Sequence, residues 1–227
     1  YTSQEEIEYI LKAIHATLPA FEIGREHILA SFAGVRPIVR SGAADPSAES
    51  RAHVVWDEEG LLTITGGKLT TFRIMAKAVL EAARPRLSGN PLFPTGKPIF
   101  NPLPHIPGDA RIDATKLDYL LGRYGAHAPA LLAAAQEGEL EMIETMPNLW
   151  AELRWAARTE GIVHLDDLLL RRVRLGMLLP GGGLALLPRV RRVVQPELGW
   201  SDQRWETEEK EYRRIWKTYY SPAPGKP

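Results

Sequence analysis

Hydrophobic and polar positions recur with different periods along the chain, and each period predicts a different element. Residues 1–16 open with Thr2-Ser3 and acidic residues, after which apolar side chains recur every three or four positions. This spacing is typical of an amphipathic helix with a capped, acid-rich first turn. Residues 27–40 are apolar but broken by Gly34 and Pro37, so we expect a strand with an irregularity at Gly34.

Two strands, a glycine turn and a helix are expected next. The apolar runs His53–Trp56 and Leu61–Thr65 flank an acidic turn and predict two strands. Leu69–Arg84 carries apolar side chains on one helical stripe, and Pro85 ends that helix.

The glycine turn at residues 65–71, TGGKLTT, is the most informative segment of the chain. Two glycines let the backbone turn tightly and approach a ligand without an intervening Cβ. The helix start presents unpaired N–H groups, Lys68 adds a positive charge, and Thr70 and Thr71 add hydroxyls. Such a turn suits an anion or an electron-rich ring. An ordinary connection between a strand and a helix explains the local pattern equally well.

The composition changes between Pro85 and Gly108, where proline and glycine recur every few residues. This predicts an inter-domain linker. Helical periodicity then returns in Asp113–Tyr124, Pro129–Gln136, Leu149–Thr159, Leu165–Arg174 and Arg204–Lys217. We therefore predict an α+β chain with a first domain at 1–86, a Pro-rich linker at 87–110 and an α-helical domain at 111–227.

The overall composition excludes several classes of function. The 28 basic and 28 acidic residues cancel, so there is no global attraction to nucleic acid. The absence of cysteine excludes disulfides and thiolate chemistry, and it fits a reducing compartment. No apolar run approaches the ~20 residues that a membrane-spanning helix needs.

Three further segments accompany the glycine turn: Ser31–Val39 (SFAGVRPIV), Ser50–Val54 (SRAHV) and Glu160–Arg172. In this order and spacing, the chain resembles the aerobic FAD-dependent glycerol-3-phosphate dehydrogenases, which carry G-[VIL]-R-P, S-R-x-H and G-G-K-L-T-T-[YF]-R. The last segment resembles that family's C-terminal helical domain. The resemblance runs from about Tyr1 to at least Tyr220.

The pyrophosphate fingerprint G-x-G-x-x-G of a dinucleotide fold is not found. The chain also begins at Tyr1 without Met, and Gly181–Gly183 reads as a connector between Pro180 and Leu184. We therefore expect the C-terminal piece of an FAD-dependent oxidoreductase, whose N-terminal half carries the nucleotide-binding motif.

The candidate substrate residues have a structural and a functional interpretation. Pro37 favours an extended backbone at Arg36, whose guanidinium could clamp a phosphate or could lie on the surface. Arg51 and His53 lie on the same face of an extended segment, although a lone histidine on a strand is usually structural. The resemblance implies that Arg36, Arg51, His53 and Lys68 bind the substrate and that Lys68 and Arg36 act in catalysis. Ala52 stands where the family often has aspartate, which could weaken a local hydrogen bond.

The resemblance also implies that FAD is the cofactor. Its expected contacts are the residues of the glycine turn and the helix start, namely Gly66, Gly67, Lys68, Leu69, Thr70 and Thr71. Arg73 lies one turn further and reads as structural.

Other patterns have simpler interpretations. His164-Leu165-Asp166-Asp167 matches no metal-binding spacing, and its acids suit a first helical turn that offsets the arginines behind it. We therefore expect no metal site. The arginine run at 189–192 reads as a solvated face. The helical spacing of Trp205, Tyr212 and Trp216 indicates that the tail docks onto the body, although a membrane-interface role stays open.

The resemblance implies an enzyme that oxidises sn-glycerol 3-phosphate to dihydroxyacetone phosphate with FAD and passes electrons to a quinone. An oxidase using oxygen, or a non-catalytic interaction module, are the alternatives. The expected partners are glycerol 3-phosphate, the electron acceptor and the N-terminal half of the same enzyme, with no nucleic acid. The expected location is cytoplasmic, and a peripheral contact with the inner face of the membrane and a homodimer are left open.

Overall fold

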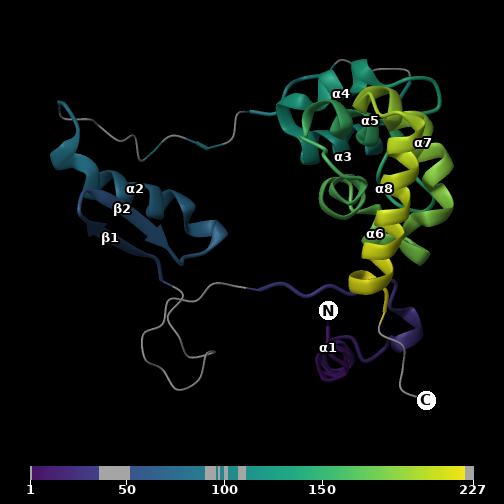
Figure 1. Ribbon diagram of the computed structural model, residues 1–227, viewed down its shortest axis with the longest axis horizontal. Coiled ribbons are helices and arrows are strands. Elements are labelled where there is room, and N and C mark those ends of the chain that lie inside the picture. The colour runs from purple at the N-terminus through teal and green to yellow at the C-terminus, as the bar shows by residue number, and fades with distance from the viewer. Residues whose placement is uncertain are drawn as a thin grey trace. The chain divides into compact units, whose positions relative to one another are not determined.

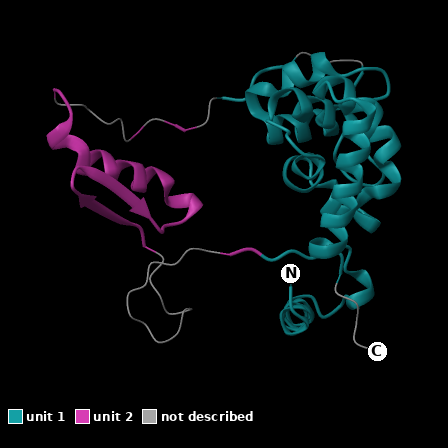
Figure 2. Ribbon diagram, in the orientation of Figure 1, with its two compact units in different colours: residues 1–33, 100–227 teal, residues 34–99 magenta. Residues whose placement is uncertain are grey.

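The computed structural model describes residues 2–35, 52–89, 96, 98–99, 102–106 and 111–222. They fall into two compact units, one of residues 1–33 with 100–227 and one of residues 34–99 (Figure 2). The described residues are mainly helical and contain one two-stranded antiparallel sheet, as the α+β prediction requires (Figure 1). Much of 87–110 lies outside the described residues, so the linker and its boundaries stay a prediction.

The elements follow one another along the chain in this order: α1 (Gln4–Thr17), η1 (Arg25–His27), β1 (Val54–Glu58), β2 (Leu61–Thr65), η3 (Leu69–Thr71), α2 (Phe72–Ala83), η4 (Arg84–Arg86), α3 (Ala114–Tyr124), η5 (Gly125–His127), α4 (Ala128–Ala134), α5 (Trp150–Thr159), η6 (Asp167–Arg172), α6 (Leu175–Leu178), η7 (Pro180–Leu186), α7 (Leu187–Leu198), α8 (Asp202–Ile215) and η8 (Trp216–Tyr220).

The first predicted helix is confirmed, and the strand predicted after it is wrong over its described part. Ser3 caps α1, accepting a hydrogen bond from the Glu6 N–H at 3.2 Å, while the Glu6 carboxylate accepts one from the Ser3 N–H at 2.8 Å. Residues 28–35 form no strand, because a strand requires a ladder partner and the described part of the chain offers this segment only isolated bonds. One of them runs from the Ser31 N–H to the Tyr220 carbonyl at 2.9 Å.

The smaller unit contains the two strands and the helix that the sequence predicted, and the helix covers the hairpin that the strands form. β1 and β2 pair antiparallel from Val54 opposite Thr65 to Glu58 opposite Leu61. Glu59 and Gly60 connect them with φ of +49° and +92°, as a tight hairpin turn requires. Helix α2 packs against both strands (Figure 1).

This unit has no buried core among its described residues 52–89, each of which keeps appreciable exposure. One stripe of α2, which contains Met75 and Val79, is half-buried. A second apolar stripe is exposed and consists of Leu69, Phe72, Ala76 and Leu80. A helix with apolar side chains on two faces is typical of a buried helix, so a further surface is needed to cover α2.

The helical unit contains two buried clusters, and α5 contributes to both. Trp205, Tyr212 and Trp216 are buried in the larger cluster, which confirms the predicted docking of the tail. The five predicted helices are present within a few residues of their expected ends, although the stretch Asp167–Arg172 winds as a π-helix. Helix α7 was missed, because Pro188 and Pro196 interrupt its pattern. Pro188 lies in the first turn, where proline is tolerated, whereas Pro196 lies inside the helix.

The arginine run at 189–192 lies on α7 and is more than a solvated face. The Arg189 guanidinium stacks 4.1 Å from the ring centre of Trp150, and its Nη2 donates to the Gly138 carbonyl at 2.9 Å. Arg191 pairs with Asp202 at 2.6 Å. The run therefore connects α7 to the starts of α5 and α8 and to the loop at Gly138.

The three glycines before α7 form a connector, as expected, but with a specific shape. Gly181, Gly182 and Gly183 have φ of +60°, +72° and +68°. The Tyr212 hydroxyl donates to the Gly182 carbonyl at 2.6 Å, and a Cβ on Gly182 would lie 2.7 Å from the indole ring of Trp216. Glycine is therefore required both for the backbone conformation and for the close approach of α8.

A network of ion pairs joins α5 to α7 in the same unit. The Arg154 guanidinium donates to both carboxylate oxygens of Glu139, at 2.6 and 2.7 Å, and also to Glu197. Arg158 donates to Glu197 at 2.5 and 2.9 Å. The Arg158 guanidinium, followed by that of Arg154, holds the pKa of Glu197 below its ordinary value of 4.5.

The lowered pKa of Glu197 predicts an acid-sensitive contribution to stability. Because the folded-state pKa is depressed, this contribution is present in full above pH 4.5 and is lost as the pH falls through the folded-state value. Glu197→Gln should cost roughly 1.5–3 kcal/mol at pH 7, typical of charge-assisted hydrogen bonds, and progressively less toward pH 3. Urea unfolding between pH 3 and 7 measures this, with the exposed Glu137→Gln as control. If the difference in unfolding free energy between the wild type and Glu197→Gln does not change with pH, the prediction is contradicted.

Candidate functional site

The glycine turn lies where β2 ends and η3 begins, and its two glycines have φ of +78° at Gly66 and +76° at Gly67. A Cβ on Gly66 would lie 2.6 Å from the carbonyl oxygen of Ala52. On Gly67 it would meet the Met75 thioether, with Cε at 3.0 Å, and the Cβ of His53 at 3.4 Å. Both positions therefore favour glycine for their conformation, as expected from the sequence, and Gly66 also requires it for space, because its obstacle is a backbone atom.

Thr71 closes the turn around Lys68. The Lys68 N–H donates to the Thr71 Oγ1 at 3.0 Å, and the Thr71 hydroxyl donates to the Lys68 carbonyl at 2.9 Å. The Thr71 N–H donates to the same carbonyl at 2.9 Å. The proton of the Thr71 hydroxyl and the Lys68 N–H are thus engaged within the turn, and Thr71 fixes its shape.

Other donors of the turn have no hydrogen-bond partner among the described residues. Within the described part of the chain, no residue accepts a hydrogen bond from the N–H groups of Gly67, Leu69 and Thr70 or from the Thr70 hydroxyl. Leu69 and Thr70 begin η3, where unsatisfied N–H groups carry a partial positive charge. An electron-rich edge that accepts hydrogen bonds fits these donors.

Lys68 adds a charge to this end of the unit. Its side chain is exposed, and within the described ranges it makes no ion pair. His53, half-buried, lies beside Gly67 just before β1 begins. The structure therefore brings together His53 and the predicted residues of the turn. Arg36 and Arg51 lie outside the described residues, and their roles stay predictions.

Met75 of α2 is a neighbour of the turn that the sequence did not single out as a site residue. The helical stripe placed it on the apolar side of α2. Its contact with the space above Gly67 depends on how the helix folds back onto the hairpin, which no local pattern shows.

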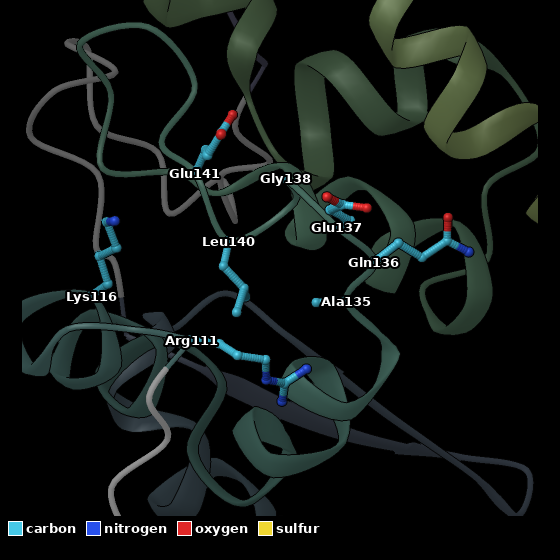
Figure 3. A pocket seen from close by; sticks show the side chains of 8 residues that line it. All are labelled: Arg111, Lys116, Ala135, Gln136, Glu137, Gly138, Leu140 and Glu141. Atoms are coloured by element: carbon cyan, nitrogen blue, oxygen red, sulfur yellow. The ribbon is translucent and has the colours of Figure 1, made fainter.

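The helical unit has a separate cavity of about 490 Å³ that the sequence did not predict (Figure 3). Arg111, Lys116, Gln136, Glu137, Leu140 and Glu141 contribute to its lining. Leu140 points toward Arg111, whereas the Glu141 carboxylate points away from it (Figure 3). Lys116 pairs with Asp113 at 3.2 Å. This mixed lining does not converge on one kind of ligand.

The acids around His164 are engaged in ion pairs and hydrogen bonds. The Glu208 carboxylate lies 3.1 Å from the His164 Nδ1 and 2.7 Å from Arg204. Asp166 and Asp167 both pair with Arg171, as first-turn acids were expected to do. No cluster of histidine and carboxylate side chains with metal-binding geometry occurs among the described residues.

Across the described ranges, no helix is both long enough and apolar enough to cross a bilayer.

The fold and the turn define a class: a hairpin followed by a glycine turn whose helix start opens N–H donors to an anionic or electron-rich ligand. The chain belongs to the family described as the C-terminal domain of alpha-glycerophosphate oxidase, whose model matches residues 63–205. The match includes the glycine turn and most of the helical unit. The resemblance noted in the sequence is thus confirmed.

Curated relatives have consistent names. Glycerol-3-phosphate dehydrogenase of Mycobacterium leprae is 32% identical over 214 residues, covering 88% of this chain and 36% of that protein. Glycerol-3-phosphate dehydrogenase 1 of Mycobacterium tuberculosis is 34% identical over 191 residues, 77% of this chain and 36% of that protein. Aerobic glycerol-3-phosphate dehydrogenase of Staphylococcus saprophyticus is 28% identical over 191 residues, which cover 75% of this chain and 34% of that protein. The chain spans about a third of the length of these relatives.

Proposed function

We propose that this chain is part of a flavoenzyme that oxidises sn-glycerol 3-phosphate to dihydroxyacetone phosphate. The observation that carries the proposal is the glycine turn, which lies within the matched family region and leaves the N–H groups of Gly67, Leu69 and Thr70 open. The names of the relatives supply the substrate, and the turn supplies a place for the cofactor.

The residues of the turn fit one edge of a flavin. When bound, FAD would supply the acceptor for the hydride that leaves the substrate. The open N–H groups at Gly67, Leu69 and Thr70 would donate to that edge, and the absence of a Cβ at Gly66 and Gly67 would let it approach. A helix start aimed at developing negative charge stabilises it by ~0.3–2 kcal/mol.

Lys68 is assigned to the substrate phosphate or hydroxyl. Its exposed ammonium has no competing carboxylate among the described residues, so its charge is available to a dianionic ligand. Arg36 and Arg51 are proposed as the partners of Lys68 at the phosphate, and His53 as a further substrate contact beside Gly67. Arg36 and Lys68 are the residues proposed to act in catalysis.

The exposed apolar stripe of α2 supports the proposal that a longer polypeptide completes the site. Leu69 is 90% exposed and Phe72 is 48% exposed, and no described residue of 52–89 is buried. The relatives are about three times as long as the aligned region. We propose that an N-terminal half covers this stripe and holds the pyrophosphate of FAD.

The electron acceptor is proposed to be a quinone. The matched family is named for an oxidase, which favours oxygen as the second candidate. The two candidates are distinguished by the product, because an oxidase releases hydrogen peroxide whereas a dehydrogenase reduces an added quinone. A peripheral membrane contact and a homodimer remain proposals from the resemblance alone.

Lys68→Ala tests the assignment in the protein expressed from its whole coding sequence. Losing one charge-assisted contact should lower kcat/KM for glycerol 3-phosphate by roughly tenfold to over a hundredfold, from ~1.5–3 kcal/mol. The flavin content should change little, because the Lys68 side chain is assigned to the substrate. Lys77→Ala, which removes an exposed lysine of α2 paired with Glu81 at 3.6 Å, is the matched control.

Unchanged kinetics in Lys68→Ala would show that the ammonium does not contact the substrate. If the wild-type protein carries no flavin and does not oxidise glycerol 3-phosphate, the flavoenzyme proposal itself fails, and a non-catalytic interaction module becomes the better explanation.

A further inference from the structure

We propose that Met75 is a positioning residue that sets how far the glycine turn projects toward its ligand. This inference rests on the proposed function of the turn. Met75 belongs to α2 and lies against Gly67, so it would act through the backbone of Gly67 rather than through the ligand.

The geometry places Met75 where the side chain of residue 67 would be. A Cβ on Gly67 would collide with the sulfur of Met75. The same Cβ would lie 3.0 Å from the Met75 Cε and 3.4 Å from the His53 Cβ. Met75 and His53 thus both lie on the side of Gly67 to which a Cβ would point. The thioether occupies the space that the missing Cβ leaves, and it supports the turn from the side of α2.

This support lies close to the open donors. Gly67 is followed by Lys68, whose N–H and carbonyl are locked by Thr71, and then by the open N–H groups of Leu69 and Thr70. Because Thr71 holds the segment from Lys68 onward in one shape, a shift at Gly67 is transmitted to those donors. Met75 would therefore control their distance from a bound flavin edge.

The side-chain chemistry of methionine suits this role. Methionine is unbranched, with three rotatable bonds and a polarisable sulfur, so it fills an irregular space against a backbone. Leucine conserves its volume closely, and such swaps are usually tolerated. Alanine removes the part of the side chain that reaches Gly67 and leaves a void beneath the turn.

The test uses Met75→Ala, Met75→Leu and Val79→Ala in the protein expressed from its whole coding sequence. Val79 lies one helical turn further on the same half-buried stripe, so Val79→Ala removes packing without touching Gly67. Three quantities are measured: the flavin-to-protein ratio after dilution, the flavin reduction potential and the thermal midpoint of unfolding.

Met75→Ala is expected to weaken flavin binding by about tenfold, or ~1.4 kcal/mol, and to make the potential more negative, because the donors of the helix start move away from the flavin edge. Met75→Leu should keep both the flavin affinity and the reduction potential close to their wild-type values. Val79→Ala should lower only the thermal midpoint. If Met75→Ala lowers the thermal midpoint as Val79→Ala does and leaves the potential unchanged, Met75 is merely a packing residue and the inference is overturned.

Gly67→Val separates this inference from the proposed function. If Gly67→Val changes flavin content and potential but Met75→Ala does not, the turn holds the flavin and only the role of Met75 is wrong. If neither variant changes them, the assignment of the turn to the flavin is itself wrong.

Discussion

Replacing Glu152 by alanine should destabilise the helical unit by ~1–3 kcal/mol, because it removes a fully buried carboxylate and leaves a buried backbone donor and two partly exposed side chains without their shared acceptor. The Glu152 side chain is fully buried at the start of α5. It accepts hydrogen bonds from the Tyr124 hydroxyl and the Leu149 N–H, each at 2.7 Å, and pairs with Arg123 at 3.1 Å. Removing it would leave the buried Leu149 N–H and the part-buried Tyr124 hydroxyl without this acceptor, whereas the partly exposed Arg123 guanidinium also donates to the Arg172 carbonyl.

The electrostatics of this site agree with a buried carboxylate that depends on its partners. Burial raises the pKa of Glu152, and Tyr124, Leu149 and Arg123 act in the opposite direction. Burial, together with the Glu152 charge, raises the pKa of Tyr119 to about 12, so this hydroxyl stays protonated and can donate toward the carboxylate. The cluster ties α3 to α5.

Urea unfolding followed by tryptophan fluorescence measures the effect, since Trp150 and Trp155 lie within three residues of Glu152. Glu152→Gln, which keeps the shape but loses the charge, should fall between the wild type and Glu152→Ala. Glu206→Ala removes an exposed glutamate of α8 and should change stability by less than ~0.5 kcal/mol. A Glu152→Ala variant with a loss below ~1 kcal/mol would show that the carboxylate is not essential to the packing.

The elements that could be predicted are those whose signals are local. The cap of α1 depends on Ser3 and Glu6, three residues apart, and the hairpin on two short apolar runs around Glu59-Gly60. Helix α7 carries two prolines, so its existence depends on packing against α5 that no window of the sequence contains. The prediction of a strand around Phe32 was wrong for a similar reason. The apolar pattern of this segment is present, but a strand also needs a neighbouring strand to pair with.

The candidate site divides in the same way. The positive φ of Gly66 and Gly67 and the helix start at Leu69 follow from the local sequence. The hydrogen bonds between Lys68 and Thr71 are local as well, since these residues are three positions apart. The placement of Met75 over Gly67 depends on how the helix folds back, which the pattern does not encode.

Valine at Gly66 should remove more flavin than valine at Gly67 from the protein expressed from its whole coding sequence. Both glycines have positive φ, which a β-branched residue adopts poorly, and this strain costs on the order of 1–3 kcal/mol. The obstacles differ. A Cβ on Gly66 meets the backbone oxygen of Ala52 at 2.6 Å, which cannot move without disturbing the start of the hairpin, whereas on Gly67 it meets the flexible Met75 side chain.

Gly60→Val is the control, since Gly60 also has positive φ, at +92°, but lies at the hairpin turn with open space around its Cα. It should lower stability while leaving the flavin potential unchanged. In Gly67→Val, the dissociation constant for FAD should rise by roughly 5- to 150-fold, which is the conversion of ~1–3 kcal/mol, so that the flavin-to-protein absorbance ratio falls at limiting FAD. The potential of the remaining flavin should become more negative as the helix start moves away. Gly66→Val should retain still less flavin. If Gly66→Val and Gly67→Val keep full flavin at an unchanged potential, residues 66–71 form a plain connection between a strand and a helix, and the flavin edge lies elsewhere.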